Sequence, residues 1–324
     1  MTSVDEAPRW WSATATWRLL SCPASASPTA APAKPPEHSA SNAGAVAHLA
    51  LQAWAEAGEW SFPDPGGRLQ ERFDEVAEVH GAEPARMPQA IITRARLKSR
   101  GKELAAILGR ASERTGLLSE LMLVDDQEHL FGIVDLVAPG PGGLIVDLKT
   151  GRDASVLSSP AIEHQMRFYA HLFQATYGSL PQSAIVFSLQ SGPVEIGVTP
   201  SATAELLSDI RTARLLAGIT ARPDAATCRF CPKRMICQPH WEALSTWDHA
   251  DAIEGRIVSI EHSTSGTVAL LVGSDWLTGI PAGLLPEGAT PGQFVRAVRI
   301  RRRRDSPLGD WCATSSTRLH IAPA

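Results

Sequence analysis

The chain has 324 residues, of which 44% are hydrophobic and 20% charged, with a formal net charge of −4. This length allows two ordinary domains with a real core, and the charge excludes a uniformly basic nucleic-acid coat while leaving room for local basic patches. No apolar run approaches the roughly 18 residues that a membrane helix needs, and the acidic start of the chain lacks the apolar segment of a secretory signal. We therefore expect a cytoplasmic protein with no membrane partner.

The first predicted elements are a linker and a helix. Residues 23–38 are rich in Pro, Ala and Ser, a composition typical of a loop or linker. Ser41 or Asn42 is suited to cap the helix that follows, which is expected to run to about Glu59.

The next stretch, residues 67–118, is predicted to be mostly helical, with interruptions near Pro84 and Pro88. One part of it reads ITRARLKSRGK and is a candidate for phosphate contacts. Its basic residues are Arg94, Arg96, Lys98, Arg100 and Lys102.

The hydrophobic pattern then changes to period two, which is typical of strands. Strands are expected over 120–126, 130–138, 143–150, 183–190 and 193–199, with helices over 161–178 and about 201–218. After about residue 250 the pattern again indicates strands, about five of them, which favours a separate small β-barrel. We place the domain boundary after residue 248.

Two of the predicted strands form a hairpin that carries charged residues. FGIVDLV and LIVDLKT flank APGPGG, whose prolines and glycines predict a chain reversal near Pro141. In that register Asp135 lies opposite Asp147, and side-chain alternation places Lys149 on the same face.

Two opposed carboxylates among apolar residues would repel each other and are costly to bury. A divalent cation removes this cost, and oxygen ligands of this kind suit Mg²⁺ or Mn²⁺. The alternative is an ordinary hairpin with surface aspartates and a solvated lysine, since D-x-K alone is a weak signal.

The order of four short motifs resembles the RecB-like branch of the PD-(D/E)XK nucleases. That pattern is G-x-x-x-H on a helix, G-x-x-D on a strand, (D/E)-x-K on a strand and Q-x-x-x-Y on a helix. The matching residues are Gly44 to His48 (GAVAH), Gly132 to Asp135 (GIVD), Asp147 to Lys149 (DLK) and Gln165 to Tyr169 (QMRFY).

The resemblance implies an α/β fold with a mixed α+β sheet, a restriction-endonuclease-like core flanked by helices. The strand pattern of residues 249–324 adds a small β domain in keeping with an OB-like barrel. It implies that His48, Asp135 and Asp147 bind Mg²⁺ or Mn²⁺, with the Leu148 carbonyl as a further ligand. Lys149 would be the catalytic lysine. Taken singly, a histidine in an Ala-rich helix and a tyrosine among apolar residues are more often packing residues.

Three further residues belong to the implied site. Gln165 and Tyr169 would support the lysine or contact the DNA strand, and their i, i+4 spacing puts both on one helix face. Glu120, at the start of the first predicted strand, fits an acidic position often seen in this branch.

Three of the five cysteines form C-x2-C-x5-C: Cys228, Cys231 and Cys237. The resemblance extends to Cys22, because iron–sulfur members of this branch, such as the AddB-type and CRISPR-adaptation nucleases, have one cysteine before the core and three after it. Four thiolates suit a [4Fe–4S] cluster. Zinc also accepts four cysteines, and His240 is a further conceivable ligand. Cys312 is expected to be a packed or free thiol.

The end of the chain carries a basic run, comprising Arg296, Arg299 and Arg301 to Arg304. An OB-like barrel binds single strands through basic grooves and stacking aromatics, and the aromatics available are Trp276, Phe294 and Trp311. The alternative to nucleic-acid binding is that the arginines form a solvent-exposed surface and the aromatic residues belong to the core.

These observations favour a metal-dependent DNA nuclease in defence, recombination or repair, acting on single-stranded or end-containing DNA. The chain has no P-loop motif, so a helicase would be a separate partner. Two alternatives stay open: a non-catalytic nucleic-acid-binding module, and a zinc-stapled interaction protein.

Overall fold

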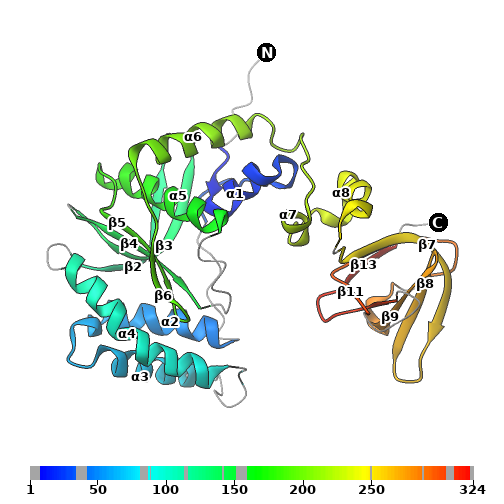
Figure 1. Cartoon of the computed structure of the whole chain (residues 1–324), viewed down its shortest axis with the longest axis horizontal. Coiled ribbons are helices and arrows are strands. Elements are labelled where there is room, and N and C mark those ends of the chain that lie inside the picture. The colour runs from blue at the N-terminus through cyan, green and yellow to red at the C-terminus, as the bar shows by residue number, and fades with distance from the viewer. Residues whose placement is uncertain are drawn as a thin grey trace. The chain divides into compact units, whose positions relative to one another are not determined.

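The computed structural model forms two compact units, one made of Met1–Leu20 and Ser27–Leu215 and the other of Ser21–Ala26 and Leu216–Ala324 (Figure 1). The boundary predicted after residue 248 stays a prediction, because compactness does not establish independent folding. The structure describes residues 8–33, 42–80, 87, 89–112, 116–140, 142–150, 159–248, 250–286, 288–303 and 310–321. Several positions named above lie outside the described residues: 34–38, Ser41, Pro84, Pro88, Pro141 and Arg304.

The first unit is built on a mixed six-stranded sheet with the order β1-β3-β4-β5-β6, in which β2 also pairs with β3. The β2–β3, β3–β4 and β5–β6 pairs are antiparallel, whereas β1–β3 and β4–β5 are parallel. This mixture confirms the α/β fold expected from the sequence. The strands are β1 (Trp11–Ser12), β2 (Leu118–Asp125), β3 (Leu130–Ala138), β4 (Leu144–Lys149), β5 (Ser183–Ser188) and β6 (Gly192–Glu195).

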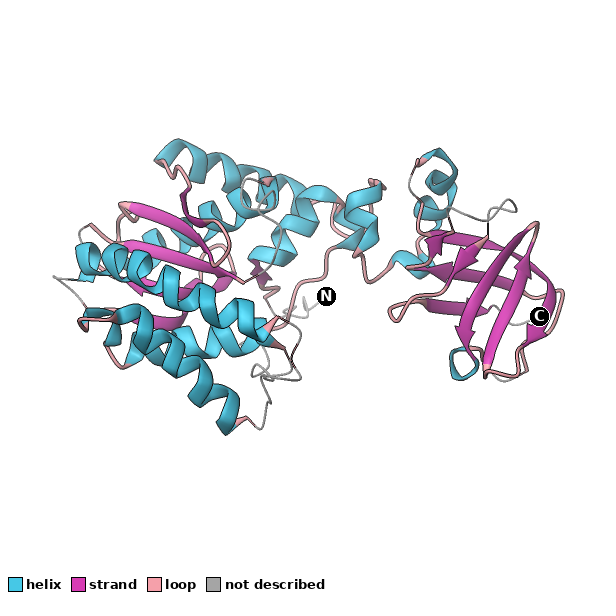
Figure 2. Ribbon diagram, turned by 60° about the horizontal axis from the view of Figure 1, so that its bottom comes forward, coloured by secondary structure: helices cyan, strands magenta, loops and turns pink. Residues whose placement is uncertain are grey.

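Helices cover both faces of this sheet (Figures 1 and 2). Helices α2, α3 and α4 bury Trp54, Phe73 and Leu97 against strand residues that include Val146 and Phe187. Helix α5 lies on the other face, next to α6. The bounds are α1 (Ala13–Ser21), α2 (Ala43–Glu56), η2 (Glu59–Ser61), α3 (Pro65–Val79), α4 (Ala90–Ser112), α5 (Pro160–Tyr177) and α6 (Pro200–Arg214). The short helix η1 (Pro23–Ser25) belongs to the second unit.

Local sequence signals explain where several of these helices begin. Asn42 caps α2 by accepting a hydrogen bond from Ala45 N at 3.0 Å, and Asp64 caps α3 in the same way with Gly67 N. Gly66 and Gly101 let α3 and α4 approach closely, because a Cβ at Gly101 would lie 2.8 Å from the Gly66 Cα.

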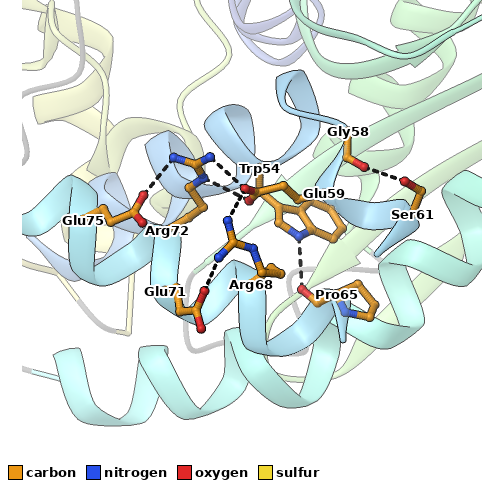
Figure 3. Close-up of polar contacts among 9 residues, drawn as sticks. All are labelled: Trp54, Gly58, Glu59, Ser61, Pro65, Arg68, Glu71, Arg72 and Glu75. Carbon is orange, nitrogen blue, oxygen red and sulfur yellow. Dashed lines mark hydrogen bonds and ion pairs between the residues drawn. The ribbon is translucent and has the colours of Figure 1, made fainter. Parts of the chain in front are cut away.

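The turn between α2 and α3 holds a buried carboxylate (Figure 3). The Glu59 residue is only 2% exposed. Its Oε1 accepts hydrogen bonds from Arg68 at 2.6 Å and from Arg72 at 2.7 Å. Trp54 Nε1 donates to Pro65 O at 3.1 Å beside it. Burial raises the pKa of Glu59, but the two guanidinium groups outweigh it and the net pKa is lowered.

Replacing Glu59 with glutamine is expected to lower the free energy of unfolding by about 2 kcal/mol at pH 7, because a buried charge-assisted pair is lost. Since the folded pKa is lowered from 4.5, the difference is fully present above that pH and disappears as pH falls through the folded value. Urea unfolding followed by circular dichroism measures it. The matched control is Glu75→Gln, which removes an exposed partner of Arg72 and should change stability by less than about 0.5 kcal/mol.

The second unit combines short helices with a seven-stranded sheet of order β11-β12-β9-β8-β7-β10-β13. The sheet is not closed by hydrogen bonds between β11 and β13 among the described residues, and two of its strands have only two residues each. The helices are α7 (Ala225–Arg229), η5 (Arg234–Ile236), α8 (Gln238–Ala243), η6 (Leu244–Thr246) and η7 (Ala282–Leu284). The strands are β7 (Ala252–His262), β8 (Thr267–Val272), β9 (Asp275–Pro281), β10 (Phe294–Val298), β11 (Arg301–Arg302), β12 (Trp311–Cys312) and β13 (Arg318–Ile321).

The short helices of this unit pack onto its sheet through Trp241, Ala252 and Val298. Ion pairs reinforce the contact, as described below. Across the part of the chain that the structure describes, no helix is both long and apolar enough to cross a membrane.

Candidate active site and cysteine site

The β3–β4 hairpin opens where its two aspartates begin. The ladder pairs Ala138 with Leu144 and ends where Leu136 pairs with Val146. Asp135 and Asp147 are the next residues in that register, as the hairpin pattern predicts. Beyond the last pair the Leu148 N–H donates to Asp135 Oδ2 at 2.5 Å instead. A backbone N–H of β4 therefore binds the side chain of Asp135 in place of a backbone carbonyl of β3.

The two carboxyl groups are in an unfavourable electrostatic environment. Burial raises the pKa of Asp135 well above its ordinary value, and the neighbouring charge of Asp147 raises it further. Burial also raises the pKa of Asp147, against the opposing effect of Lys149, whose Nζ lies 2.7 Å from Asp147 Oδ2. That oxygen is buried and has no hydrogen-bond donor apart from this ion pair among the described residues. Asp147 therefore has one compensating positive charge, that of Lys149, whereas Asp135 takes part in no ion pair among the described residues.

Glu120 reaches the same place from β2. Its neighbours Ser119 and Leu121 pair with Leu136 and Val134, so Glu120 lies across from Asp135, and its backbone has a φ of 46°. Its charge contributes to the raised pKa of Asp135. Glu120 thus lies on β2 at the register position beside Asp135, on the side of β3 away from β4.

A hydrogen-bonded chain leads from the lysine to helix α5. Lys149 Nζ donates to Gln165 Oε1 at 3.2 Å, and Gln165 Nε2 donates to Tyr169 Oη at 3.1 Å. Burial raises the pKa of Tyr169, helped by the charge of Asp147. Gly132 makes room for this helix, because a Cβ there would lie 2.7 Å from Tyr169 Cε1.

His48 is half-buried on α2. It is one turn beyond Gly44 on the same helix face, and a Cβ at Gly44 would lie 3.0 Å from Thr150 Oγ1, directly after β4. The predicted G-x-x-x-H pattern therefore lies where α2 approaches the end of the lysine strand. No group of three or more His, Cys, Asp or Glu side chains is arranged to hold a metal ion among the described residues.

The residues of the first site nevertheless suit a hard divalent cation. Oxygen ligands of carboxylates are what Mg²⁺ and Mn²⁺ prefer, and a cation would offset the charge of half-buried Asp135 and buried Asp147 beyond what Lys149 alone provides. A metal would be held by these two carboxylates, whose pKa values are both raised by desolvation.

The second unit contains a cavity of about 310 Å³ whose wall includes Cys22, Cys228, Cys231 and Cys237. Cys22 and Cys228 are buried. Burial raises the pKa of Cys228 to about 11, with contributions from the nearby Cys231 and Cys22. The structure therefore brings the four predicted cysteines to one place. Cys312 is elsewhere, on β12, with its Sγ 3.6 Å from Thr278 Oγ1.

Backbone and lysine contacts hold the Cys22 segment at this cavity. Arg222 N donates to Cys22 Sγ at 3.3 Å. Lys233 Nζ donates to the carbonyl oxygens of Ala24 at 2.9 Å and Ala26 at 3.2 Å. Sequence reasoning missed Lys233, which lies inside the C-x2-C-x5-C motif, because no local pattern identifies the distant carbonyls that it binds.

A second group of residues that sequence reasoning did not identify joins the C-x2-C-x5-C motif to the β-sheet of the second unit. The Arg234 guanidinium is 3% exposed and forms an ion pair with Asp251, while its Nε donates to His240 Nε2 at 3.1 Å. Arg296 donates to Met235 O at 3.2 Å and lies over the Trp241 ring. Arg296, counted in the basic run of the sequence, is thus a packing residue.

The basic residues predicted to bind nucleic acid differ in their exposure and in whether an acidic side chain pairs with them. Arg94 is engaged by Asp74, with Nη2 and Oδ2 2.6 Å apart. Arg301 and Arg302 are exposed on β11, and the Arg302 guanidinium lies over the buried Trp311 ring at 5.7 Å. Arg299 has a φ of 59° and its carbonyl accepts from Thr314 and Thr317. On α4, Arg96 is half-buried and Lys98 exposed, and neither forms an ion pair with another described residue.

Comparison with known proteins gives one family. The model of a family described as the PD-(D/E)XK nuclease superfamily matches residues 10–238, which is more than half of the chain. No curated protein matches the chain significantly. Among solved structures, a crystal structure of SSO0001 is similar with 12% sequence identity and a TM-score of 0.31, over 60% of this chain and 84% of that chain.

Proposed function

Because the chain belongs to the PD-(D/E)XK nuclease superfamily, we propose that it is a Mg²⁺- or Mn²⁺-dependent deoxyribonuclease of the RecB-like branch. Its substrate is single-stranded or end-containing DNA, and its setting is defence, recombination or repair. The observation that carries the proposal is the pair of neighbouring carboxylates of Asp135 and Asp147, both with a raised pKa, with Lys149 Nζ 2.7 Å from the second.

Each residue of the site has a role in this proposal. Asp135 and Asp147 hold the cation, with His48 and the Leu148 carbonyl as the further ligands that the family pattern suggests. When bound, the cation polarises a phosphoryl oxygen and lowers the pKa of a water molecule. Lys149 faces the phosphate with its ammonium group and stabilises the negative charge that develops during hydrolysis.

The remaining residues orient the lysine. Gln165 accepts from Lys149 Nζ and is itself held by Tyr169 Oη, so this pair fixes the direction of the ammonium group. Glu120 is close enough to Asp135 to influence its pKa and serves as a third acidic group at the cation. Gly132 is required because a larger residue would displace Tyr169.

Basic side chains supply contacts to the DNA backbone. On α4 these are Arg96 and Lys98, with a smaller part for Arg94 because Asp74 neutralises it. In the second unit, the sheet would bind single-stranded DNA as an OB-like barrel does, through Arg299, Arg301 and Arg302. The Arg302 guanidinium lies over the Trp311 ring. Phosphate contacts of this kind make binding weaker as salt rises.

We propose that the four cysteines hold a [4Fe–4S] cluster. Zinc, which four thiolates bind at about 2.3 Å from the ion, is the alternative occupant. A cavity of about 310 Å³ with all four cysteines in its wall suits a larger group. The N–H of Arg222 at Cys22 Sγ is the kind of donor that stabilises cluster sulfurs.

Cleavage of end-labelled DNA tests the proposal. The wild-type protein with Mg²⁺ or Mn²⁺ is expected to cut single-stranded DNA or DNA with free ends, and EDTA should abolish cutting. Asp147→Ala and Lys149→Ala should each lower the rate about 10³-fold or more, which equals about 4 kcal/mol of transition-state stabilisation. Lys98→Ala serves as the control, since it should weaken binding without abolishing cleavage.

The same assay separates the alternatives. Equal cutting by the wild type and both site variants would remove the nuclease proposal. DNA binding without any cutting, under every metal condition, would favour a non-catalytic nucleic-acid-binding module. Zinc without iron after anaerobic purification, and no DNA binding, would favour a zinc-stapled interaction protein.

A further inference from the structure

His240 stands out among the residues that line the cysteine cavity. It is fully buried, with 0% of its surface exposed, and it is part of the cavity wall. Its backbone N–H bonds to Cys237 O, which fixes the residue directly behind the last cysteine of the motif. Aromatic rings hold the imidazole in place, with centroids 4.9 Å away for Trp241 and 5.2 Å for Trp247.

The hydrogen bond from Arg234 fixes the tautomer of this histidine. Arginine has only donors, so the Nε–H of Arg234 that points to His240 Nε2 at 3.1 Å requires a lone pair on Nε2. A histidine with a lone pair on Nε2 carries its proton on Nδ1. Asp251 holds the Arg234 guanidinium with two hydrogen bonds, so the arginine cannot easily turn away.

The proton on Nδ1 then has no acceptor. His240 Nδ1 is buried and has no hydrogen-bond partner within the described part of the chain. An unsatisfied buried donor costs about 1–3 kcal/mol, so native proteins keep one only for a reason. Rotating the ring by half a turn would not help, because Arg234 would lose its acceptor.

We propose that His240 is a hydrogen-bond donor to the sulfur of the group that the four cysteines hold, and that it is not a ligand of that group. The inference rests on the proposed [4Fe–4S] cluster. A protonated Nδ1 cannot coordinate iron, but it can donate to a thiolate or sulfide sulfur. Such a donor stabilises the more negative, reduced form of a cluster and so raises its reduction potential.

The test compares His240→Phe, which removes the donor and keeps an aromatic ring, with His240→Asn. In asparagine the amide nitrogen is bonded to Cγ, as Nδ1 is, so it restores a donor near the same position. Trp247→Phe is the matched control, because it alters the packing against the imidazole and leaves Nδ1 in place. Each full-length protein is reconstituted anaerobically with iron and sulfide, its iron and sulfide are measured, and its midpoint potential is determined by titration with dithionite.

We expect all four proteins to contain the same iron and sulfide. The equilibrium constant for reduction should fall by up to about tenfold in His240→Phe, which is 59 mV for a one-electron couple. His240→Asn should recover most of that difference, and Trp247→Phe should match the wild type. The cluster of His240→Phe should also be lost faster in air, since its sulfurs have lost a donor.

Different results overturn different statements. Fully loaded His240→Phe with an unchanged potential and unchanged lifetime in air would refute the role of His240 and leave the cluster proposal standing. Loss of one iron in His240→Phe would also refute it, because the histidine would then be a ligand. Wild-type protein that takes up no iron and sulfide would refute the cluster proposal and this inference together. If His240→Phe does not fold, His240→Leu takes its place as the variant without a donor, and a loaded His240→Leu protein with the potential of the wild type and of His240→Asn would refute the role of His240.

Discussion

Replacing Asp135 with asparagine is expected to raise the thermal stability of the metal-free protein while lowering cleavage about 10³-fold or more. The gain arises because burial and the charge of Asp147 raise the pKa of Asp135, so the ionised side chain destabilises the folded state. Asparagine keeps an oxygen that can accept from Leu148 N and removes the charge. The loss of cleavage arises because the cation loses a carboxylate ligand.

The pH dependence of this gain has a definite sign. The pKa of Asp135 is raised in the folded state above its ordinary 3.8. Between pH 3.8 and the folded pKa, the folded protein therefore binds more protons than the unfolded chain. The stability of the wild type therefore falls as pH rises from about 3.8 through the folded value. The advantage of Asp135→Asn is absent at low pH and fully present once pH exceeds the folded pKa.

Thermal melting in EDTA and in Mn²⁺, at several pH values, measures both effects. Mn²⁺ should raise the melting temperature of the wild type at neutral pH and leave Asp135→Asn almost unchanged, with each kcal/mol of stabilisation giving about 2–4 °C. Asp126→Asn, an exposed aspartate in the turn after β2, is the control and should behave as the wild type. A metal-free Asp135→Asn protein that melts below the wild type at pH 8 would contradict the account of the site.

The hairpin of the candidate site could be predicted from the sequence because its signals are local. A run of prolines and glycines sets the turn, and side-chain alternation then fixes the register that brings Asp135 next to Asp147. The helix with Gln165 and Tyr169 follows from a 3.6-residue pattern that continues over five turns. In each of these cases the information lies within about 20 residues of sequence, where period and turn chemistry are informative.

Other elements could not be predicted because their stability comes from distant contacts. Strand β1 has two residues and exists only because Trp11 and Ser12 pair with Leu130 and Phe131. Helix α1 follows it directly and was not expected from the sequence. Residues Arg234, His240 and Asp251 lie within 17 positions of one another, yet their hydrogen bonds depend on how the cysteine segment folds back on the sheet. No periodic pattern encodes such a triad.

The opening of the β3–β4 ladder is a further feature that pattern reasoning does not reach. Alternation of side chains predicts which residues share a face, but it does not predict that backbone pairing stops at Leu136 and Val146. The consequence for the site is large, because the freed Leu148 N–H is what fixes the Asp135 carboxylate. The G-x-x-D motif is explained only by a tertiary contact, since its glycine gives Tyr169 the space to approach.

Replacing Cys22 with serine is expected to remove most of the iron and sulfide from the anaerobically reconstituted protein. Cys22 is the one cysteine of the cavity that comes from the N-terminal side of the chain, and Arg222 N and Lys233 Nζ hold its segment in place. Serine offers a hard oxygen in place of a thiolate and disfavours an iron–sulfur group. The visible absorbance of the cluster should fall in proportion.

The same substitution should lower stability, because the proposed cluster links Cys22 to Cys228 across the whole of the first unit. A cross-link that closes a loop of 100 residues or more lowers the entropy of the unfolded chain, which raises its free energy by about 4–5 kcal/mol. The wild type should therefore melt well above Cys22→Ser only when it contains the cluster. Cys312→Ser, whose sulfur lies beside Thr278 on another strand, is the matched control and should keep full iron content and the wild-type melting temperature. Equal iron and equal melting in Cys22→Ser and the wild type would show that the N-terminal cysteine is not part of the cluster, and the four-cysteine site would have to be replaced by one built on the C-x2-C-x5-C motif alone.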